Sequence, residues 1–184
     1  MSIVIAGLGG SLRAGSHASA ALRDILALAR ERGAATELLD LAELRLPVFL
    51  PDAGPEEYDA ASRTAIERLV GASRRADAFV WASPTYHGSM SGAFKNALDF
   101  MEYLRRDDPP YLQGKPVGLI ALHEADTLAA MASCVRGLRA WLAPTRVLLQ
   151  GSDFGPDGSV GPERVRRRMS RLVEELLSFR RAPG

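Results

Sequence analysis

The sequence predicts a three-layer α/β fold with a mostly parallel sheet. Its apolar segments are short and continuous, without the alternation of polar residues that marks a strand with one wet face, so they suit strands covered on both sides. They alternate along the chain with segments of helical periodicity. The 184 residues, 47% apolar and 24% charged, have a globular composition, and we expect one domain over residues 1–184.

Five strands and five helices are expected, in alternation. The strands are expected at residues 3–8, 36–41, 78–82, 116–122 and 145–149. The helices are expected from Ser16 to the capping Gly33, over 58–75, 91–104 and 128–142, and from Pro162 onward. Because crossovers between parallel strands are right-handed, the natural order for five strands is the flavodoxin-like 2-1-3-4-5. Ligands of such sheets bind at the carboxyl ends of the strands, so the loops after the first, third and fourth strands should carry the chemistry.

The loop after the first strand is rich in glycine and hydroxyl groups. Glycines let the backbone approach a ligand closely, and the following helix presents unpaired N–H groups to an anion. Ser11 and Ser16 add hydroxyl donors, and Arg13 adds a charged fork suited to phosphate. No Walker A lysine follows, and Leu12 stands where a dinucleotide fingerprint needs its last glycine. The loop predicts a phosphate site, with a plain glycine turn and a solvated Arg13 as the alternative.

The loop after the third strand, residues 83–92, has the features of a wall for a planar heterocycle. Pro84 is expected to stop the strand ladder, and backbone amides then lie beside Tyr86 and His87. The helix that begins near Ser91 would point its positive end at the same place, which favours an electron-rich group such as a reduced flavin. The alternative is that the serines only cap the helix while Tyr86 packs in the core.

Together, GSLRAGS at residues 10–16 and SPTYHGSMSGAFKNALD at residues 83–99 resemble the NAD(P)H-dependent FMN reductase family. That family contains flavodoxin-like flavin, azo-dye, quinone and chromate reductases, and the resemblance extends from residue 3 to about 149. It implies FMN and NAD(P)H as cofactors. It also implies that the phosphate is held by Ser11, Arg13 and Ser16, and that the isoalloxazine is lined by Pro84, Thr85, Tyr86 and His87.

Two positions depart from the family's pattern. Ala18 stands where the family often has asparagine, so this position of the cofactor site is expected to lack one hydrogen bond. The loop after the fourth strand contains His123, Glu124 and Asp126 where the family is commonly glycine-rich, and we expect a narrower flavin pocket or a changed acceptor. The same three side chains suggest a metal cluster, but ligands so close in sequence rarely converge without a partner elsewhere, and no metal is expected.

The expected function is the transfer of hydride from NAD(P)H through FMN to free flavin, a quinone, an azo compound or a metal oxyanion, or release of reduced flavin to a monooxygenase. No side chain need act as acid or base, because hydride passes directly between stacked rings. One alternative is a flavin-binding electron-transfer module without nicotinamide turnover, although such carriers tend to be strongly acidic. Another is a Rossmann domain in which Asp40 binds the ribose hydroxyls.

Charge and composition bound the partners. The net charge of +1 argues against nucleic acid, and the single Cys134 excludes an internal disulfide. No apolar run is long enough to span a membrane, and no signal segment is recognised, so we expect the cytoplasm. Phe100 and Tyr103 lie off the apolar stripe of the 91–104 helix and suggest a homodimer or homotetramer interface, unless the loop at 107–113 covers them.

Overall fold

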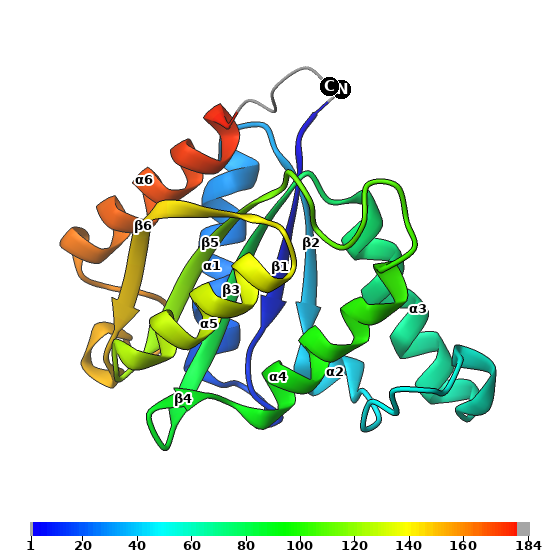
Figure 1. Ribbon diagram of the computed structural model, residues 1–184. Coiled ribbons are helices and arrows are strands. Elements are labelled where there is room, and N and C mark those ends of the chain that lie inside the picture. Colours follow the sequence, from blue (N-terminus) through cyan, green and yellow to red (C-terminus); the bar gives the residue numbers. More distant parts are fainter. Residues whose placement is uncertain (1, 180–184) are drawn as a thin grey trace.

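A central sheet organises the chain in the computed structural model, which describes residues 2–179 (Figure 1). The parallel strands are β1 (Val4–Gly9), β2 (Ala35–Asp40), β3 (Ala78–Tyr86), β5 (Pro116–Leu122) and β6 (Trp141–Leu149). They lie in the order β2-β1-β3-β5-β6, and the two-residue β4 (Ser89–Met90) pairs antiparallel with the end of β3. Without β4, this is the 2-1-3-4-5 order that the sequence predicts, so the flavodoxin-like topology is confirmed.

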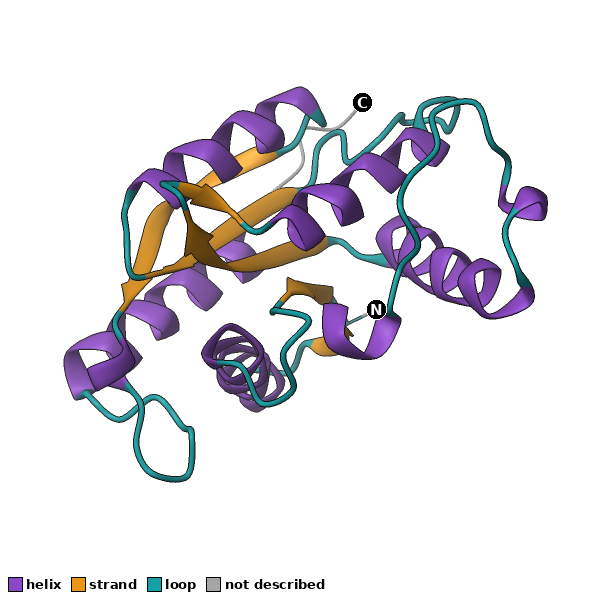
Figure 2. Cartoon of the chain, turned by 90° about the horizontal axis from the view of Figure 1, so that it is seen from below, coloured by secondary structure: helices purple, strands orange, loops and turns teal. Residues whose placement is uncertain are grey.

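Helices cover both faces of the sheet (Figure 2). One face carries α1 (His17–Glu31) and α6 (Glu163–Ser178), and the other carries α3 (Ala60–Arg75), α4 (Gly92–Asp99) and α5 (Asp126–Gly137). The short elements are α2 (Leu41–Leu44) and the 3-10 turns Pro55–Glu57, Phe100–Leu104 and Gly151–Asp153. None of the helices within residues 2–179 is long and apolar enough to cross a membrane.

The continuous apolar runs are explained by burial on both sides of the sheet. In β3, Phe79 and Trp81 join the core under α3, α4 and α5, while Val80 and Ala82 join the core under α1 and α6. Successive side chains of a strand point to opposite faces, so a strand between two helical layers needs apolar residues at every position.

Strand β3 is longer than the sequence predicts. It continues past Ala82 to Tyr86, and Pro84 pairs with Leu122 of β5, so the expectation that Pro84 stops the ladder is wrong. The N–H of Gly10 donates to the carbonyl of Ala82 at 3.0 Å, so the backbone groups of Ala82 face β1. Two residues later, the backbone groups of Pro84 also point toward the β1 side of the sheet, where β1 has already ended. Proline's lack of an N–H therefore costs the sheet no hydrogen bond.

Two predicted helices are also shorter than expected. The helix expected over 128–142 is α5, which ends at Gly137, and β6 begins at Trp141. Arg139 takes a left-handed φ of 61° between them, and the N–H of Ala140 donates back to the carbonyl of Val135 at 3.0 Å. Helices commonly end with a residue in this left-handed conformation, which is usually glycine. Position 139 is an arginine, so the sequence does not show where the helix ends. The helix expected over 91–104 is α4 followed by a 3-10 turn.

The rings of Phe100 and Tyr103 are covered by their own chain. Phe100 is fully buried, and its ring lies 5.3 Å from that of Phe49 and 6.0 Å from that of Tyr58. The hydroxyl of Tyr103 donates to the carbonyl of Ala53 at 2.7 Å, and burial raises the pKa of this phenol to about 12. The inference that the Phe100 ring packs against another chain is therefore wrong, while Tyr103 is half-buried.

Candidate functional site

The loops expected to carry the chemistry lie together at one edge of the sheet. The carboxyl ends of β1, β3 and β5 share this edge, which is the lower one in Figure 1. In register, Gly9 of β1 pairs with Ala82, and Pro84 pairs with Leu122 of β5. A glycine loop at residues 10–16, the β3–β4 hairpin and the loop before α5 therefore surround one place.

The glycine loop depends on glycine at the two positions where it leaves β1. Gly9 has a φ of 142°, and a Cβ there would lie 1.9 Å from the carbonyl oxygen of Ala82. Gly10 has a φ of 91°, and a Cβ there would lie 2.5 Å from the hydroxyl oxygen of Ser19. Only glycine lets the chain turn this closely against β3 and α1, which is what a loop that cradles a ligand requires.

Helix α1 begins at the end of this loop with a double serine cap. The Ser16 hydroxyl accepts from the N–H of Ser19 at 3.2 Å, and the two hydroxyl oxygens are 2.9 Å apart. Both serines are buried, and Ser19 is a residue that the sequence interpretation missed, although its spacing of three from a capping serine signals it. The side chain of Ala18 is buried in the core, so this residue offers a ligand only its backbone.

Ser11 and Arg13 differ in exposure. Ser11 is buried, and its hydroxyl accepts from the N–H of Arg13 at 3.3 Å, which shapes the first turn of the loop. Arg13 itself is exposed, so its guanidinium reaches solvent at the mouth of the loop. One residue thus holds the loop from inside while the other presents charge outside.

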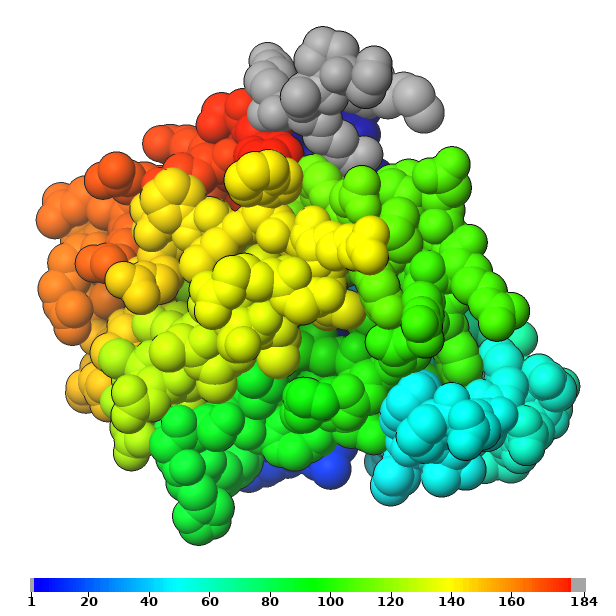
Figure 3. Space-filling view, in the orientation of Figure 1, coloured from blue at the N-terminus to red at the C-terminus, as the bar shows by residue number. Residues whose placement is uncertain are grey.

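The hairpin of β3 and β4 puts an aromatic ring at the surface. Thr85 pairs with Met90 and Tyr86 with Ser89, and the turn residues His87 and Gly88 have φ values of 52° and 73°, as a two-residue type I′ turn requires. Tyr86 is 55% exposed, so the alternative that it packs in the core is wrong. The hairpin projects from the lower edge of the molecule (Figure 3). Some backbone amides of the hairpin pair within the hairpin itself, so not all of them are available to a ligand.

Hydroxyl groups tie the base of the hairpin to its surroundings. The Ser83 hydroxyl donates to the carbonyl of Pro84 at 2.8 Å and accepts from the N–H of Ser91 at 3.0 Å. Ser91 caps α4. The Thr85 hydroxyl lies 2.5 Å from the carbonyl oxygen of Leu122 and 2.8 Å from the hydroxyl of Thr127. The base is therefore fixed on one side to α4 and on the other to the end of β5.

The loop before α5 exposes the side chains of His123 and Glu124, and the first residue of α5, Asp126, is exposed beside them. His123 has a φ of 79°, and its N–H donates to the carbonyl of Leu149 at 2.8 Å, which ties the loop to β6. Within residues 2–179, no group of three or more His, Cys, Asp or Glu side chains is placed to hold a metal ion. The loop therefore brings acidic groups to the rim of the site.

Asp40, the candidate of the Rossmann alternative, is already engaged. It is buried, caps α2 by accepting from the N–H of Ala42 at 3.0 Å, and lies 3.7 Å from the Arg23 guanidinium. Its carboxylate holds the chain where β2 ends, close behind Gly10. This arrangement argues against Asp40 as a ligand of ribose hydroxyls.

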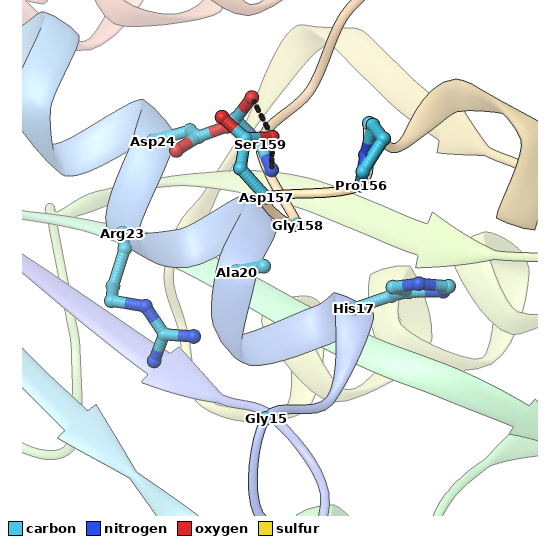
Figure 4. Close-up of a pocket in the computed structure, with 10 residues that line it drawn as sticks. Gly15, His17, Ala20, Arg23, Asp24, Pro156, Asp157, Gly158 and Ser159 are labelled. Atoms are coloured by element: carbon cyan, nitrogen blue, oxygen red, sulfur yellow. Dashed lines mark hydrogen bonds between the residues drawn. The ribbon is translucent and has the colours of Figure 1, made fainter.

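Two hollows flank the glycine loop. One, of about 350 Å³, lies between α1 and residues 155–159 (Figure 4). Its acidic groups hold that loop: Asp24 accepts from the N–H of Val160 at 2.7 Å, and the Ser159 hydroxyl lowers the pKa of Asp157. The other hollow, also of about 350 Å³, is mainly apolar. Its lining residues are Leu12, Leu41, Leu46, Val48, Gly92, Ala93 and Asn96.

Comparison with known proteins gives consistent relatives. The family model for NADPH-dependent FMN reductases matches residues 3–153. The FMN-dependent NADPH-azoreductase of Staphylococcus saprophyticus is 32% identical over 179 residues, which cover 92% of this chain and 91% of that protein. The corresponding Staphylococcus aureus azoreductase is 31% identical over 178 residues, with the same coverage of both chains.

Among solved structures, a flavoenzyme NAD(P)H:(acceptor) oxidoreductase from Paracoccus denitrificans superimposes with a TM-score of 0.72 at 21% identity. The match covers 96% of each chain. At this identity the likeness shows a shared fold.

Proposed function

The chain belongs to the family of NADPH-dependent FMN reductases, and from that membership we propose that it passes hydride from NAD(P)H through FMN to a small organic acceptor. It is an oxidoreductase of a family that uses FMN and NAD(P)H. The observation that carries the proposal is the meeting of the glycine loop and the hairpin at one edge of the sheet, where open α/β sheets bind ligands.

The glycine loop fits the phosphate of FMN. We assign the phosphate to Ser11, Arg13 and Ser16, at the start of α1, where backbone N–H groups and the helix dipole favour an anion. Ser19 supports Ser16, and Ala18 takes part only through its N–H. The exposed Arg13 supplies the countercharge at the mouth of the loop.

The hairpin fits the isoalloxazine. We assign this ring to the segment from Pro84 to His87, in which Tyr86 offers a flat, half-exposed surface. When bound, FMN supplies a ring that takes hydride from the nicotinamide and gives two electrons to the acceptor. The chain's part is to hold the ring in place and keep water from it, and no side chain is needed as acid or base. We therefore propose Thr85 and His87 as lining residues and name no catalytic residue.

Among the acceptors, we propose azo compounds, because the two staphylococcal relatives are named azoreductases. Decolourisation of an azo dye should consume NADPH, with a quinone, free FMN and chromate compared at equal concentration. Faster turnover of chromate than of every aromatic acceptor would contradict this assignment. Weak retention of reduced FMN would instead favour delivery to a flavin-dependent monooxygenase.

The central test is whether the purified protein binds FMN and oxidises NAD(P)H. We expect flavin absorbance or a saturable FMN titration, and NAD(P)H consumption that depends on FMN. FMN binding without NAD(P)H consumption would favour the electron-transfer module. Bound NAD(P) without flavin affinity would favour a Rossmann-type site, and neither flavin affinity nor NAD(P)H oxidation would end the proposal.

We also propose that a second copy of the chain covers the apolar surface formed by Leu12, Val48 and Leu50. These side chains are 66%, 75% and 52% exposed, and the first two line the same hollow. The net charge of +1 leaves little repulsion between copies. Sedimentation should give a dimer or tetramer, and Val48→Asp should shift it toward monomer. A monomer of the unaltered protein with FMN present would contradict the second copy.

We propose further that residues 1–184 work as one domain in the cytoplasm. The support for one domain is that α6, beyond the matched range, packs on β6 and α1 and so completes one face of the sheet. The support for the cytoplasm is the need for NAD(P)H and a chain whose lone cysteine cannot form an internal disulfide. Fractionation of the source cell tests the compartment, and recovery with a membrane pellet would contradict it.

A further inference from the structure

A chain of two hydroxyl groups joins the hairpin to the end of the neighbouring strand. The Thr85 hydroxyl lies 2.5 Å from the carbonyl oxygen of Leu122 and 2.8 Å from the Thr127 hydroxyl. Thr85 is the residue before the last in β3, Leu122 is the last residue of β5, and Thr127 lies in the first turn of α5. Thr85 is half-buried and Thr127 is fully buried. Three elements thus meet at one side chain.

The direction of these bonds follows from the groups themselves. A carbonyl oxygen only accepts, so Thr85 donates its single hydroxyl proton to Leu122. Thr127 must then donate to Thr85, whose proton is already used. The only hydroxyl proton of Thr85 is therefore already donated within the protein, and Thr85 has no proton to donate to a bound ring. The hydroxyl of Thr127 is buried behind it and out of reach of any ligand.

We propose that Thr85 and Thr127 are positioning residues, whose hydroxyl chain fixes the hairpin and sets the place of the neighbouring Tyr86. This inference rests on the proposed function and deepens it, because it assigns the Thr85 side chain to the support of the wall of the flavin site. The residue still lines the site through its backbone, and its hydroxyl acts through the hairpin.

The hairpin needs such a support because its own pairing is short. Strand β4 has two residues, and only two residue pairs join it to β3. A two-stranded hairpin is marginal in water without further contacts. The parallel ladder between β3 and β5 ends at Pro84 and Leu122, so the Thr85 hydroxyl makes the next link along the strand. Holding the hairpin before a ligand arrives removes an ordering cost from binding.

The test compares variants that keep shape and lose the hydroxyl. FMN affinity by titration, and the visible circular dichroism of bound FMN, would be measured for Thr85→Val, Thr127→Val, the double variant and Thr85→Ser. Thr145→Val is the matched control, since the hydroxyl of Thr145 also bridges a strand to a helix: Thr145 lies on β6 and donates to Glu175 on α6 at 2.6 Å. Urea unfolding of every variant separates lost stability from lost affinity.

We expect each valine variant to raise the Kd for FMN by about 2- to 12-fold, as removal of one buried hydrogen bond implies. The double variant should lose little more than the larger single loss, because both hydroxyls belong to one chain. Thr85→Ser should restore the affinity and the circular dichroism, and Thr145→Val should lose stability without changing either.

Each outcome decides a different claim. If the unaltered protein does not bind FMN, the proposed function fails. If it binds FMN and the valine variants keep its Kd and circular dichroism, the positioning role is overturned while the proposed function stands. Failure of Thr85→Ser to restore binding also overturns it. Should Thr85→Val not fold, Thr127→Val decides alone, and an unchanged Kd in that variant contradicts the inference.

Discussion

The two loops of the candidate site are built in opposite ways. The glycine loop is shaped by its backbone: three glycines with positive φ, at positions 9, 10 and 15, turn it onto α1, and Arg13 extends into solvent. The hairpin is shaped by side chains, since hydroxyls of Ser83 and Thr85 tie its base to α4 and β5. An anion needs donors that face outward, whereas a planar ring needs a wall that stays in place. The difference suggests which end of FMN each loop serves.

The largest expected effect is on the backbone of the glycine loop. Gly9→Ala should lower the free energy of unfolding by about 3 kcal/mol or more, because its Cβ would meet the carbonyl oxygen of Ala82, which cannot rotate away. Gly15→Ala is the matched control: it also has positive φ, but its Cβ meets nothing within 4 Å, so only the local strain of about 1–2 kcal/mol remains. Urea unfolding measures both. Equal losses would show that close approach to β3 does not shape this loop.

The next effect is on charge. Arg13→Ala should weaken FMN by about 1.5–3 kcal/mol, or roughly 10- to 150-fold, because it removes a charge-assisted contact to phosphate. Riboflavin, which lacks the phosphate, should lose far less. Arg166→Ala on α6 is the control, since that arginine is also exposed and lies outside the loop. Titration of both flavins measures the difference, and equal losses for FMN and riboflavin would remove Arg13 from the phosphate site.

The features that the sequence predicts correctly are local. Apolar runs such as Val4–Gly9 reveal strands because a parallel sheet between two helical layers buries every position. The glycine loop is recognisable because it is one continuous segment between a buried strand and a helix. The β3–β4 hairpin is not predicted, since residues 83–92 are expected to be a loop after a strand that ends before Pro84. The order of strands then follows from handedness, and it places both loops at the same edge.

The features that it misses depend on contacts between distant residues. Thr85 and Thr127 are 42 residues apart, and nothing in either segment marks their bond. The cover of Phe100 by Phe49 is likewise a matter of packing, and helical periodicity alone places that ring outside. The end of α5 is a local feature that is also missed: Arg139, two residues after the helix, takes a left-handed conformation that a glycine there would have signalled, so the helix is expected to run too far.

A smaller effect concerns the joint between the hairpin and α4. Ser91→Ala should lower the free energy of unfolding by about 0.5–2 kcal/mol, because the buried hydroxyl that accepts from the N–H of Phe94 at 3.2 Å is lost. The bond from Ser91 to Ser83 uses the backbone N–H and stays. Ser89→Ala, two residues earlier in β4, is the control and should stay within about 0.5 kcal/mol. If the two alanine variants lose the same free energy of unfolding, the Ser91 cap makes no specific contribution to stability.

The smallest expected effect comes from the exposed ring of Tyr86 in the hairpin. Tyr86→Ala should weaken FMN by about 0.5–1.5 kcal/mol, or roughly 2- to 12-fold, because a stacking surface is lost. Its free energy of unfolding should change by less than about 0.5 kcal/mol, since the side chain is 55% exposed. Tyr86→Phe keeps the ring and should bind FMN as the unaltered protein does.

Riboflavin separates the roles of Tyr86 and Arg13. Tyr86→Ala should weaken riboflavin as much as FMN, since both carry the same ring, whereas Arg13→Ala should weaken FMN far more than riboflavin. Titration of the two flavins against the two variants therefore gives four values with opposite patterns. If Tyr86→Ala spares riboflavin while weakening FMN, the hairpin contacts the phosphate end, and the assignment of the ring to the hairpin is wrong.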